Sequence, residues 1–385
     1  MLPHVTARLN DLELLARLVA IDTTSCNATD ALFDFVCEYV AHSRVRIERF
    51  RVDAGHENVL LAVGPNCAAG EGLLLCGHVD TVPADEPEWT SDPRALTMRD
   101  DRVVGRGACD MKGFDALAIN LLLACADRVS TAPLQEPLYL LLTCNEEIGT
   151  LGAAAFARAW PRERPLPRRT LVGEPTSMRV VRGHKGHLTI SIVVQGIAAH
   201  SGFPMKGVNA IERAARVITA LAALREEFAR EQNAESALFP EVPYPVLTTA
   251  RVRGGSAINV IPERCEIDVG VRLLPGMPSS DCVARIGAAI AAVSTPGTVT
   301  VRLTNETPAF ATPADHPLHL ELCRLMGQHG DAGVGFGTDA GRLAALGLDC
   351  VIWGPGDIAN AHRADEWMPL EEFARAAAVL RQLVR

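Results

Sequence analysis

Apolar positions in the first 175 residues follow two spacings, one typical of helices and one typical of buried strands. Between residues 9 and 19 apolar side chains recur every three or four positions, which predicts a helix with one buried face. Two further helices are predicted at 111–128 and 150–160. Short apolar runs that end in glycine or polar residues predict the buried strands of an α/β sheet at 59–63, 73–76, 138–143 and 170–172.

Beyond residue 177 the pattern changes to strands that bury only one face. Leu188, Ile190 and Ile192 alternate with polar or small residues, as in a strand that has one side in a core. The predicted elements then run in the order βαββαβ, which is typical of a ferredoxin-like sandwich. Its strands are predicted at 188–194, 245–252, 265–273 and 298–303, and its helices at 208–231 and 280–293.

After residue 305 the α/β pattern returns. Helices are predicted at 316–329 and 370–384, with a turn around 335–341 and a strand at 350–353 between them. The fold class predicted is therefore α/β with two domains. Residues 1–177 and 306–385 are expected to form one α/β domain, and residues 178–305 a smaller inserted domain.

Composition and charge narrow the class of protein. The chain has 385 residues, 48% of them apolar and 22% charged, as in a folded globular protein. A formal net charge of −9 without a basic run disfavours nucleic acid as a partner. No apolar run approaches the ~18 residues that span a bilayer, and the first ten residues lack a signal-peptide pattern, so we expect no membrane partner and a cytoplasmic location. The eleven cysteines include no CxxC pair and are expected to be free, mostly buried thiols.

Histidine and carboxylate residues follow the predicted strands and turns of the α/β domain. They are His78, Asp80, Asp110, Glu146, Glu147, Glu174 and His362. Because ligands of open α/β sheets bind beyond the carboxyl ends of the strands, we expect these residues to gather at one edge. Each alone could be an ordinary loop residue, a helix cap or an acidic first turn, but five such ends together favour a shared site. Mixed histidine and carboxylate ligands are typical of zinc or a similar divalent ion.

Other catalytic patterns in the chain are weak. There is no GxSxG elbow and no P-loop, and the GxGxxA-like run at 354–359 contains proline and lacks a following βαβ unit. Cys109 beside Asp110 could be a nucleophile, but the sequence places no base for it. Metal-dependent catalysis is the leading interpretation, with a non-catalytic metal- or amino-acid-binding protein and a structural oligomerisation protein as alternatives.

Five sequence blocks, in this order along the chain, resemble the M20 family of two-zinc peptidases and deacylases. They are GHVDTVP at 77–83, DMKG at 110–113, EE at 146–147, GEPT at 173–176 and AH at 361–362. The resemblance covers essentially the whole chain. It implies a metal-dependent, exopeptidase-like α/β catalytic domain with an inserted lid or dimerisation domain, and hence a homodimer.

The resemblance implies a two-metal site in the α/β domain. Asp110 would bridge two divalent ions, zinc in the first instance, with cobalt or manganese as alternatives. His78 and Glu174 would complete the ligands of one ion, and Glu147 and His362 those of the other. The peptide bond between Asp110 and Met111 would be cis.

Three further residues receive catalytic roles from the resemblance. Glu146 would be the general base that takes a proton from water and returns it to the leaving amine. Asp80 would hold the second ring nitrogen of His78. His200, in the inserted domain, would reach across a dimer interface and stabilise the tetrahedral intermediate in the partner's site.

The substrate class that the resemblance implies is an N-acyl amino acid. Such a substrate presents an α-carboxylate, which an arginine can bind with two parallel hydrogen bonds. Arg272, on a strand of the inserted domain, is the candidate, aided by Asn259 and the backbone around Gly335. A solvated strand arginine is the alternative.

Within the family, four blocks are similar to acetylornithine deacetylases; they lie at 182–187, 242–245, 272–277 and 354–356. The block GTDAGR at 337–342, near the substrate in the family, is closer to succinyl-diaminopimelate desuccinylase. The resemblance implies hydrolysis of the amide bond of an N-acetylated amino acid, N-acetyl-L-ornithine first, as a step of arginine biosynthesis. A desuccinylase, an acetylcitrulline deacetylase and a dipeptidase stay open.

Overall fold

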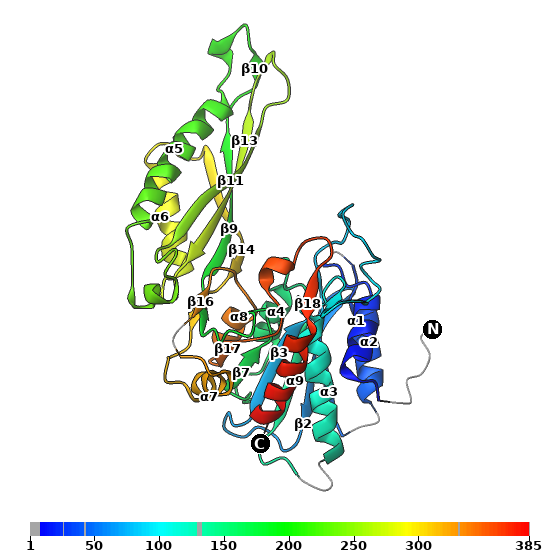
Figure 1. The fold of residues 1–385 in the computed structure, drawn as a ribbon. Coiled ribbons are helices and arrows are strands. Elements are labelled where there is room, and N and C mark those ends of the chain that lie inside the picture. The colour runs from blue at the N-terminus through cyan, green and yellow to red at the C-terminus, as the bar shows by residue number, and fades with distance from the viewer. Residues whose placement is uncertain (1–7, 26, 42–43, 129–132, 330–331, 385) are drawn as a thin grey trace. The chain divides into compact units, whose positions relative to one another are not determined.

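The computed structural model describes residues 8–25, 27–41, 44–128, 133–329 and 332–384. The chain divides into two compact units (Figure 1). Unit 1 comprises residues 1–182, 312–332 and 338–385, and unit 2 comprises residues 183–311 and 333–337. The inserted unit thus begins at 183, where the sequence suggested 178, and ends at 311, where the sequence suggested 305. It also takes in a short later segment, because that segment pairs with its first strand.

Unit 1 is built around a six-stranded sheet with the strand order β1-β2-β6-β3-β7-β17. Its strands are β1 (Arg46–Asp53), β2 (His56–Val63), β3 (Leu73–His78), β6 (Leu138–Thr143), β7 (Arg169–Val172) and β17 (Asp349–Ile352). The four strands from β6 to β17 are parallel, and β1 and β2 extend the sheet in antiparallel pairing. Every residue of β3 and β6 is buried, as expected for strands covered on both faces.

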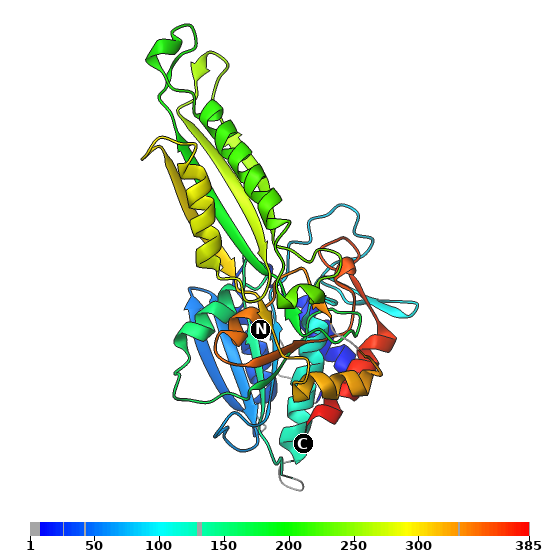
Figure 2. The same cartoon turned by 90° about the vertical axis from the view of Figure 1, so that its left-hand side faces the viewer.

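Helices cover the two faces of this sheet (Figure 2). One face packs against α3 (Lys112–Arg128), which also contacts α1 (Asp11–Ala20) and α9 (Leu370–Leu383). The other face packs against α4 (Leu151–Ala159), which contacts α8 (Ala340–Ala344). The remaining helices of unit 1 are α2 (Asp30–Val40), α7 (Pro317–Met326) and the short η3 (Ile358–Asn360).

A second, small sheet of unit 1 joins two distant parts of the chain. It has the order β18-β5-β4 and consists of β4 (Thr97–Arg99), β5 (Arg102–Val104) and β18 (Trp367–Pro369), all antiparallel. The pairing of β5 with β18 lays the segment before residue 367 beside the segment after residue 104. Both segments carry predicted metal ligands.

Unit 2 has the predicted ferredoxin-like βαββαβ order. Its sheet, in the order β11-β13-β9-β14, consists of β9 (Gly186–Gln195), β11 (Val246–Gly254), β13 (Arg264–Leu273) and β14 (Val299–Thr307). Two helices, α5 (Ala210–Phe228) and α6 (Ser279–Ala291), share one core with one face of the sheet. That face is apolar because alternate residues of β9 point into the core, whereas the residues between them are half-buried or exposed.

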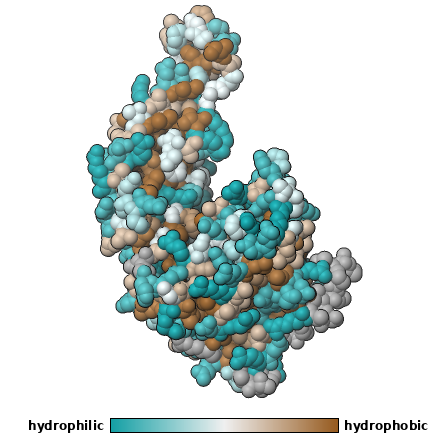
Figure 3. Space-filling model, viewed as in Figure 1, coloured by the Kyte–Doolittle hydropathy of each residue, from teal (hydrophilic) through white to brown (hydrophobic). Residues whose placement is uncertain are grey.

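Short elements finish the two ends of the unit 2 sheet. At one end β10 (Ala199–His200) pairs with β12 (Val260–Ile261), next to the turn η1 (Pro204–Lys206). At the other end β8 (Gly183–His184) pairs with β15 (Phe310–Ala311) and β16 (Gly333–Val334), and η2 (Ala234–Leu238) lies before β11. The β10 end exposes three large apolar side chains, Phe203, Met205 and Ile258. Brown and tan atoms are visible at the top of the molecule in Figure 3.

Two further predictions can be compared with the described residues. Their ten cysteines are all free, and nine of them are buried, as expected. None of their helices is both long enough and apolar enough to cross a bilayer.

Candidate metal centre

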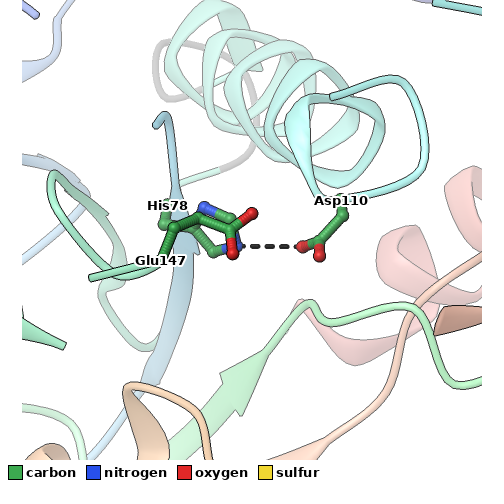
Figure 4. Close-up of side chains that lie close together, drawn as sticks. All are labelled: His78, Asp110 and Glu147. Atoms are coloured by element: carbon green, nitrogen blue, oxygen red, sulfur yellow. Dashed lines mark hydrogen bonds and ion pairs between the residues drawn. The ribbon is translucent and has the colours of Figure 1, made fainter. Parts of the chain in front are cut away.

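His78 is the last residue of β3, and its ring is buried at the carboxyl edge of the sheet. Its Nδ1 lies 3.0 Å from the main-chain oxygen of Asp80. Because a carbonyl oxygen can only accept, Nδ1 carries the proton of this hydrogen bond. The other ring nitrogen, Nε2, lies 3.0 Å from Oδ1 of Asp110 (Figure 4). Burial acts to lower the pKa of His78, but the contact with Asp110 and the charge of Glu174 raise it well above its usual value.

Asp110 precedes α3 and presents its two carboxylate oxygens to two different histidines. Oδ1 faces His78, and Oδ2 lies 3.2 Å from Nε2 of His362. Burial acts to raise the pKa of Asp110, yet its contacts with His362 and His78 hold the pKa well below the usual range. The peptide bond between Asp110 and Met111 is cis, as the family resemblance implied. A carboxylate shared between two imidazoles in this way has the arrangement of a bridging ligand.

Glu147 and His362 face each other, and each lies close to Asp110. Nε2 of His362 lies 3.1 and 3.0 Å from the two carboxylate oxygens of Glu147. The contact of His362 with Asp110 and, next in size, its contact with Glu147 raise the pKa of His362 to about 10. Glu147, His78 and Asp110 each offer one ligand atom, and the three atoms lie within 4.8 Å of one another (Figure 4).

Glu174 follows β7 and completes the group on the His78 side. Its Oε2 lies 4.0 Å from Nε2 of His78, and its side chain is buried. Burial, followed by the charge of Asp110, raises its pKa well above the usual value. The structure therefore brings together all five residues named as ligands from the sequence.

The carboxylate of Asp80 does not make the contact expected of it. Oδ1 lies 3.7 Å from Nδ1 of His78, whose hydrogen bond goes to the main-chain oxygen instead. The carboxylate accepts the main-chain N–H of Glu146 at 3.0 Å, that of Glu147 at 3.2 Å and the hydroxyl of Ser25 at 2.8 Å. Asp80 is fully buried, so it fixes the backbone of the adjacent glutamates more directly than it fixes the histidine ring. Ser25 was not singled out from the sequence, because nothing local links it to position 80.

Glu146 comes shortly after β6, and no donor among the described residues hydrogen-bonds to its carboxylate. Burial raises its pKa well above the usual value, and the nearby charge of Glu174 raises it further. A carboxyl with a raised pKa and free oxygens can take up and release a proton near neutral pH.

Asp339, in the block 337–342, lies inside unit 1. Its Oδ2 accepts the hydroxyl of Thr143 at 2.6 Å, and its side chain is only 1% exposed. Burial raises its pKa to about 6. The sequence placed this block near the substrate; its aspartate is buried like His78 and Glu174, and its charge acts on Glu146 and Glu174.

The candidates in unit 2 fall at its two ends. His200 belongs to β10 and is exposed, as is Asn259. The two lie at the same end, because the main-chain oxygen of Asn259 accepts the N–H of Ser201, the residue after His200, at 2.9 Å. Arg272 lies near the opposite end of the sheet, and eight residues, or about 27 Å, separate it from Arg264 along β13.

Gly335 follows β16 and lies at the Arg272 end. One small ligand therefore cannot contact both Asn259 and Arg272 of the same protomer. Asn259 could aid Arg272 in binding the same substrate only if the two residues came from different protomers.

The donor set fits a pair of divalent cations. With Nδ1 of His78 donating to a carbonyl, Nε2 is the ring nitrogen that faces a carboxylate oxygen 3.0 Å away, and either a proton or a metal ion between them supplies the positive charge that both atoms favour. Asp110, Glu147 and Glu174 are buried together or nearly so, and uncompensated carboxylates repel one another. Imidazole and carboxylate ligands are typical of zinc, cobalt and manganese sites.

Comparison with known proteins agrees with this geometry. The sequence profile of peptidase family M20/M25/M40 matches residues 74–385. An acetylornithine deacetylase of Proteus mirabilis is 34% identical over 386 residues, covering 97% of this chain and 95% of its own. An acetylornithine deacetylase of Klebsiella pneumoniae is 37% identical over 335 residues, covering 86% of this chain and 84% of its own.

Solved structures share the fold at low sequence identity. A metallo-carboxypeptidase of the M20 family from Sulfolobus solfataricus has a TM-score of 0.79 with 18% identity over 98% of both chains. A dinuclear metal-binding peptidase of the M20 family from Bacillus subtilis has a TM-score of 0.67 with 15% identity over 97% of this chain and 96% of its own. The expected two-unit architecture is thereby confirmed, and the chain belongs to peptidase family M20/M25/M40.

Proposed function

We propose that the protein hydrolyses the amide bond of N-acetyl-L-ornithine and releases acetate and L-ornithine. The observation that carries the proposal is the group in which buried Asp110 faces two histidines, while no donor among the described residues binds the carboxylate of Glu146. The similarity to acetylornithine deacetylases at 34–37% identity over most of the chain supports the choice of substrate. In this role the enzyme would supply ornithine for arginine biosynthesis in the cytoplasm.

The proposed cofactor is a pair of divalent ions, with zinc first and cobalt or manganese as metals that suit the same ligands. Asp110 would hold both ions, His78 and Glu174 one of them, and Glu147 and His362 the other. When bound, such a pair polarises the amide carbonyl and makes a water more acidic.

Glu146 is the proposed general base and acid. Its half-buried carboxylate can take a proton from water and give one to the leaving amine nitrogen. Asp80 holds the main chain of Glu146 in place through the N–H that it accepts. Because the same carboxylate also holds the N–H of Glu147, the base and a ligand keep a set position relative to each other.

Arg272 is the proposed anchor for the substrate α-carboxylate. It lies opposite His187 in the pairing of β13 with β9, and among the described residues no carboxylate pairs with it. Burial, together with the charge of Arg272, lowers the pKa of His187 to about 4 and that of Lys185 to about 8. A partly buried guanidinium with basic neighbours favours a bound anion. The exposed backbone at Gly335 would line the same end.

We further propose a homodimer formed through unit 2, in which His200 and Asn259 act at the partner's site. The N–H of Gly202 donates to Nδ1 of His200 at 3.0 Å. Nδ1 is therefore the acceptor nitrogen, and a neutral ring carries its proton on Nε2, as a donor to an oxyanion must. The exposed Phe203, Met205 and Ile258 at this end favour burial against a second copy.

The test is an amine-release assay on N-acetyl-L-ornithine, N-acetyl-L-citrulline, N-succinyl-L,L-diaminopimelate and a dipeptide. It is run on the chelator-treated protein and again after Zn²⁺, Co²⁺ or Mn²⁺ is added back. We expect the highest kcat/KM on N-acetyl-L-ornithine, lost with the chelator and restored by metal. A higher kcat/KM on another substrate would overturn the choice of substrate, and activity that survives complete metal removal would overturn the metal mechanism.

A further inference from the structure

Two segments of unit 1 that are far apart in the sequence meet beside the proposed metal site. One runs from Gly105 to Asp110, and the other from His362 to Glu366. Neither segment belongs to a long helix or strand, and His362 and Asp365 have positive φ values of 57° and 53°, which non-glycine residues rarely adopt. Contacts with the rest of unit 1 must therefore determine where the two ligands, Asp110 and His362, lie.

Glu366 makes these contacts with both carboxylate oxygens. Oε1 accepts the main-chain N–H of Cys109 at 2.9 Å and that of Asp110 at 3.0 Å. Oε2 accepts a hydrogen bond from Nη1 of Arg106 at 2.9 Å, and the main-chain oxygen of Glu366 accepts the N–H of Gly105 at 3.0 Å. The side chain is only 1% exposed, so water does not compete for these hydrogen bonds.

Arg106 holds the Glu366 carboxylate from the other side. Its guanidinium is buried and donates through Nη1 to Glu366 and through Nη2 to Glu86 at 2.8 Å. Nη1 also lies 3.3 Å from the main-chain oxygen of Arg363, the residue that follows His362. The guanidinium lies over the ring of Trp89, 5.2 Å from its centre. Arg106 thus contacts the His362 segment at two points.

We propose that Glu366, held by Arg106, is a positioning residue that fixes Asp110 and His362 relative to each other and so sets the affinity of the site for metal. The inference rests on the proposed two-metal function. Asp110 must offer one oxygen in the direction of His362, and Glu366 holds the main-chain N–H of that aspartate. The residue that holds the Asp110 loop also ends the segment that carries His362. A shift of either segment would change the separation of the two ligands.

The test compares Glu366→Gln with wild type and with a matched control, Glu86→Gln. Glutamine keeps the size of the side chain and one acceptor oxygen, but its amide nitrogen cannot accept from Arg106 or from a main-chain N–H. Glu86→Gln alters the outer partner of the same guanidinium and leaves the contacts of Glu366 in place. Zn²⁺ and Co²⁺ affinities are measured by titration of the chelator-treated proteins, with the Co²⁺ absorption spectrum as a report of ligand geometry.

We expect Glu366→Gln to bind metal 10–100-fold more weakly, as changes to groups that orient metal ligands do, with an altered Co²⁺ spectrum. Glu86→Gln should stay within threefold of wild type. Unchanged affinity and spectrum in folded Glu366→Gln would overturn the inference, even if its melting temperature falls, because that result would show a structural role only. An equal loss of affinity in both variants would also overturn it.

A second variant covers the case in which Glu366→Gln does not fold. Arg106→Lys keeps the positive charge, but one ammonium lacks the planar fork that reaches Glu86 and Glu366 at once. We expect a loss of metal affinity of at least threefold, and wild-type affinity would overturn the inference. If wild type itself binds neither metal, the proposed metal function fails. If wild type binds metal and the variants match it, only the inference about Glu366 fails.

Discussion

Asp80→Asn tests whether one buried carboxylate sets the positions of the proposed base and of an adjacent ligand. Oδ1 of Asp80 accepts the N–H of Glu146, and Oδ2 accepts the N–H of Glu147 and the hydroxyl of Ser25. Asparagine keeps one acceptor oxygen. Whichever oxygen the amide nitrogen replaces, at least one of the two main-chain N–H groups loses its acceptor.

The expected magnitudes follow from these contacts. Leaving one buried polar group without a partner costs about 1–3 kcal/mol, so the free energy of unfolding should fall by that amount. Because the same change releases the backbone of Glu146 or Glu147, kcat/KM on N-acetyl-L-ornithine should fall about 10–100-fold. Urea unfolding of the metal-free protein measures the first effect, and initial rates in the metal-loaded protein measure the second.

Ser25→Ala is the matched control for Asp80→Asn. It removes only the hydroxyl donor and leaves both acceptors of the main-chain N–H groups intact. We expect a stability loss of about 1 kcal/mol and a kcat/KM within threefold of wild type. The reasoning is refuted if Asp80→Asn keeps wild-type kcat/KM, or if Ser25→Ala loses as much activity as Asp80→Asn.

Three further predictions concern catalysis and substrate binding. Glu146→Ala should keep its metal content, measured by elemental analysis, and lose about 10²–10⁴-fold in turnover; near-normal turnover would remove Glu146 from the mechanism. Arg272→Lys should raise KM for a substrate with a free α-carboxylate but not for its amide, and an equal rise for both would indicate a structural role. Mixing inactive His200→Ala with inactive Glu146→Ala under conditions that exchange subunits should restore activity, since some heterodimers carry one intact composite site. No recovery despite proven exchange would exclude action in the partner's site.

The longest elements could be predicted because the local spacing of their apolar residues indicates which positions are buried. The helix predicted at 111–128 is α3, and the one-sided alternation after residue 187 is β9. The edge strand β1 was not predicted, because its residues are mostly exposed or half-buried and give no apolar run. Helix α2 was not predicted either, although its sequence carries a helical signal, since Leu32, Val36 and Val40 are buried at helical spacing.

The candidate ligands could be predicted for a similar reason, because a residue at the end of a buried strand is placed at the sheet edge by the strand itself. The groups that orient the ligands could not. Glu366 and Asp110 are 256 positions apart, and only the folded chain brings them within 3.0 Å. The direction of the Asp80 carboxylate could not be predicted either. Asp80 follows β3, whereas its partners at 146 and 147 follow a different strand, β6.

The insertion of unit 2 into unit 1 has a consequence for how the protein is made. Residues 183–311 leave the ribosome before β17, α9 and His362, although these complete the unit that began at the N-terminus. Asp110 is synthesised 252 positions before His362 (362 − 110), which corresponds to roughly 10–50 s at ~5–20 residues per second. From the synthesis of β7 until that of β17, which lies within that interval, β7 has no strand on the side that β17 will occupy. The edge of β7 is then open to other chains, so factors that bind nascent chains should matter more for unit 1 than for unit 2, most of which is one continuous segment.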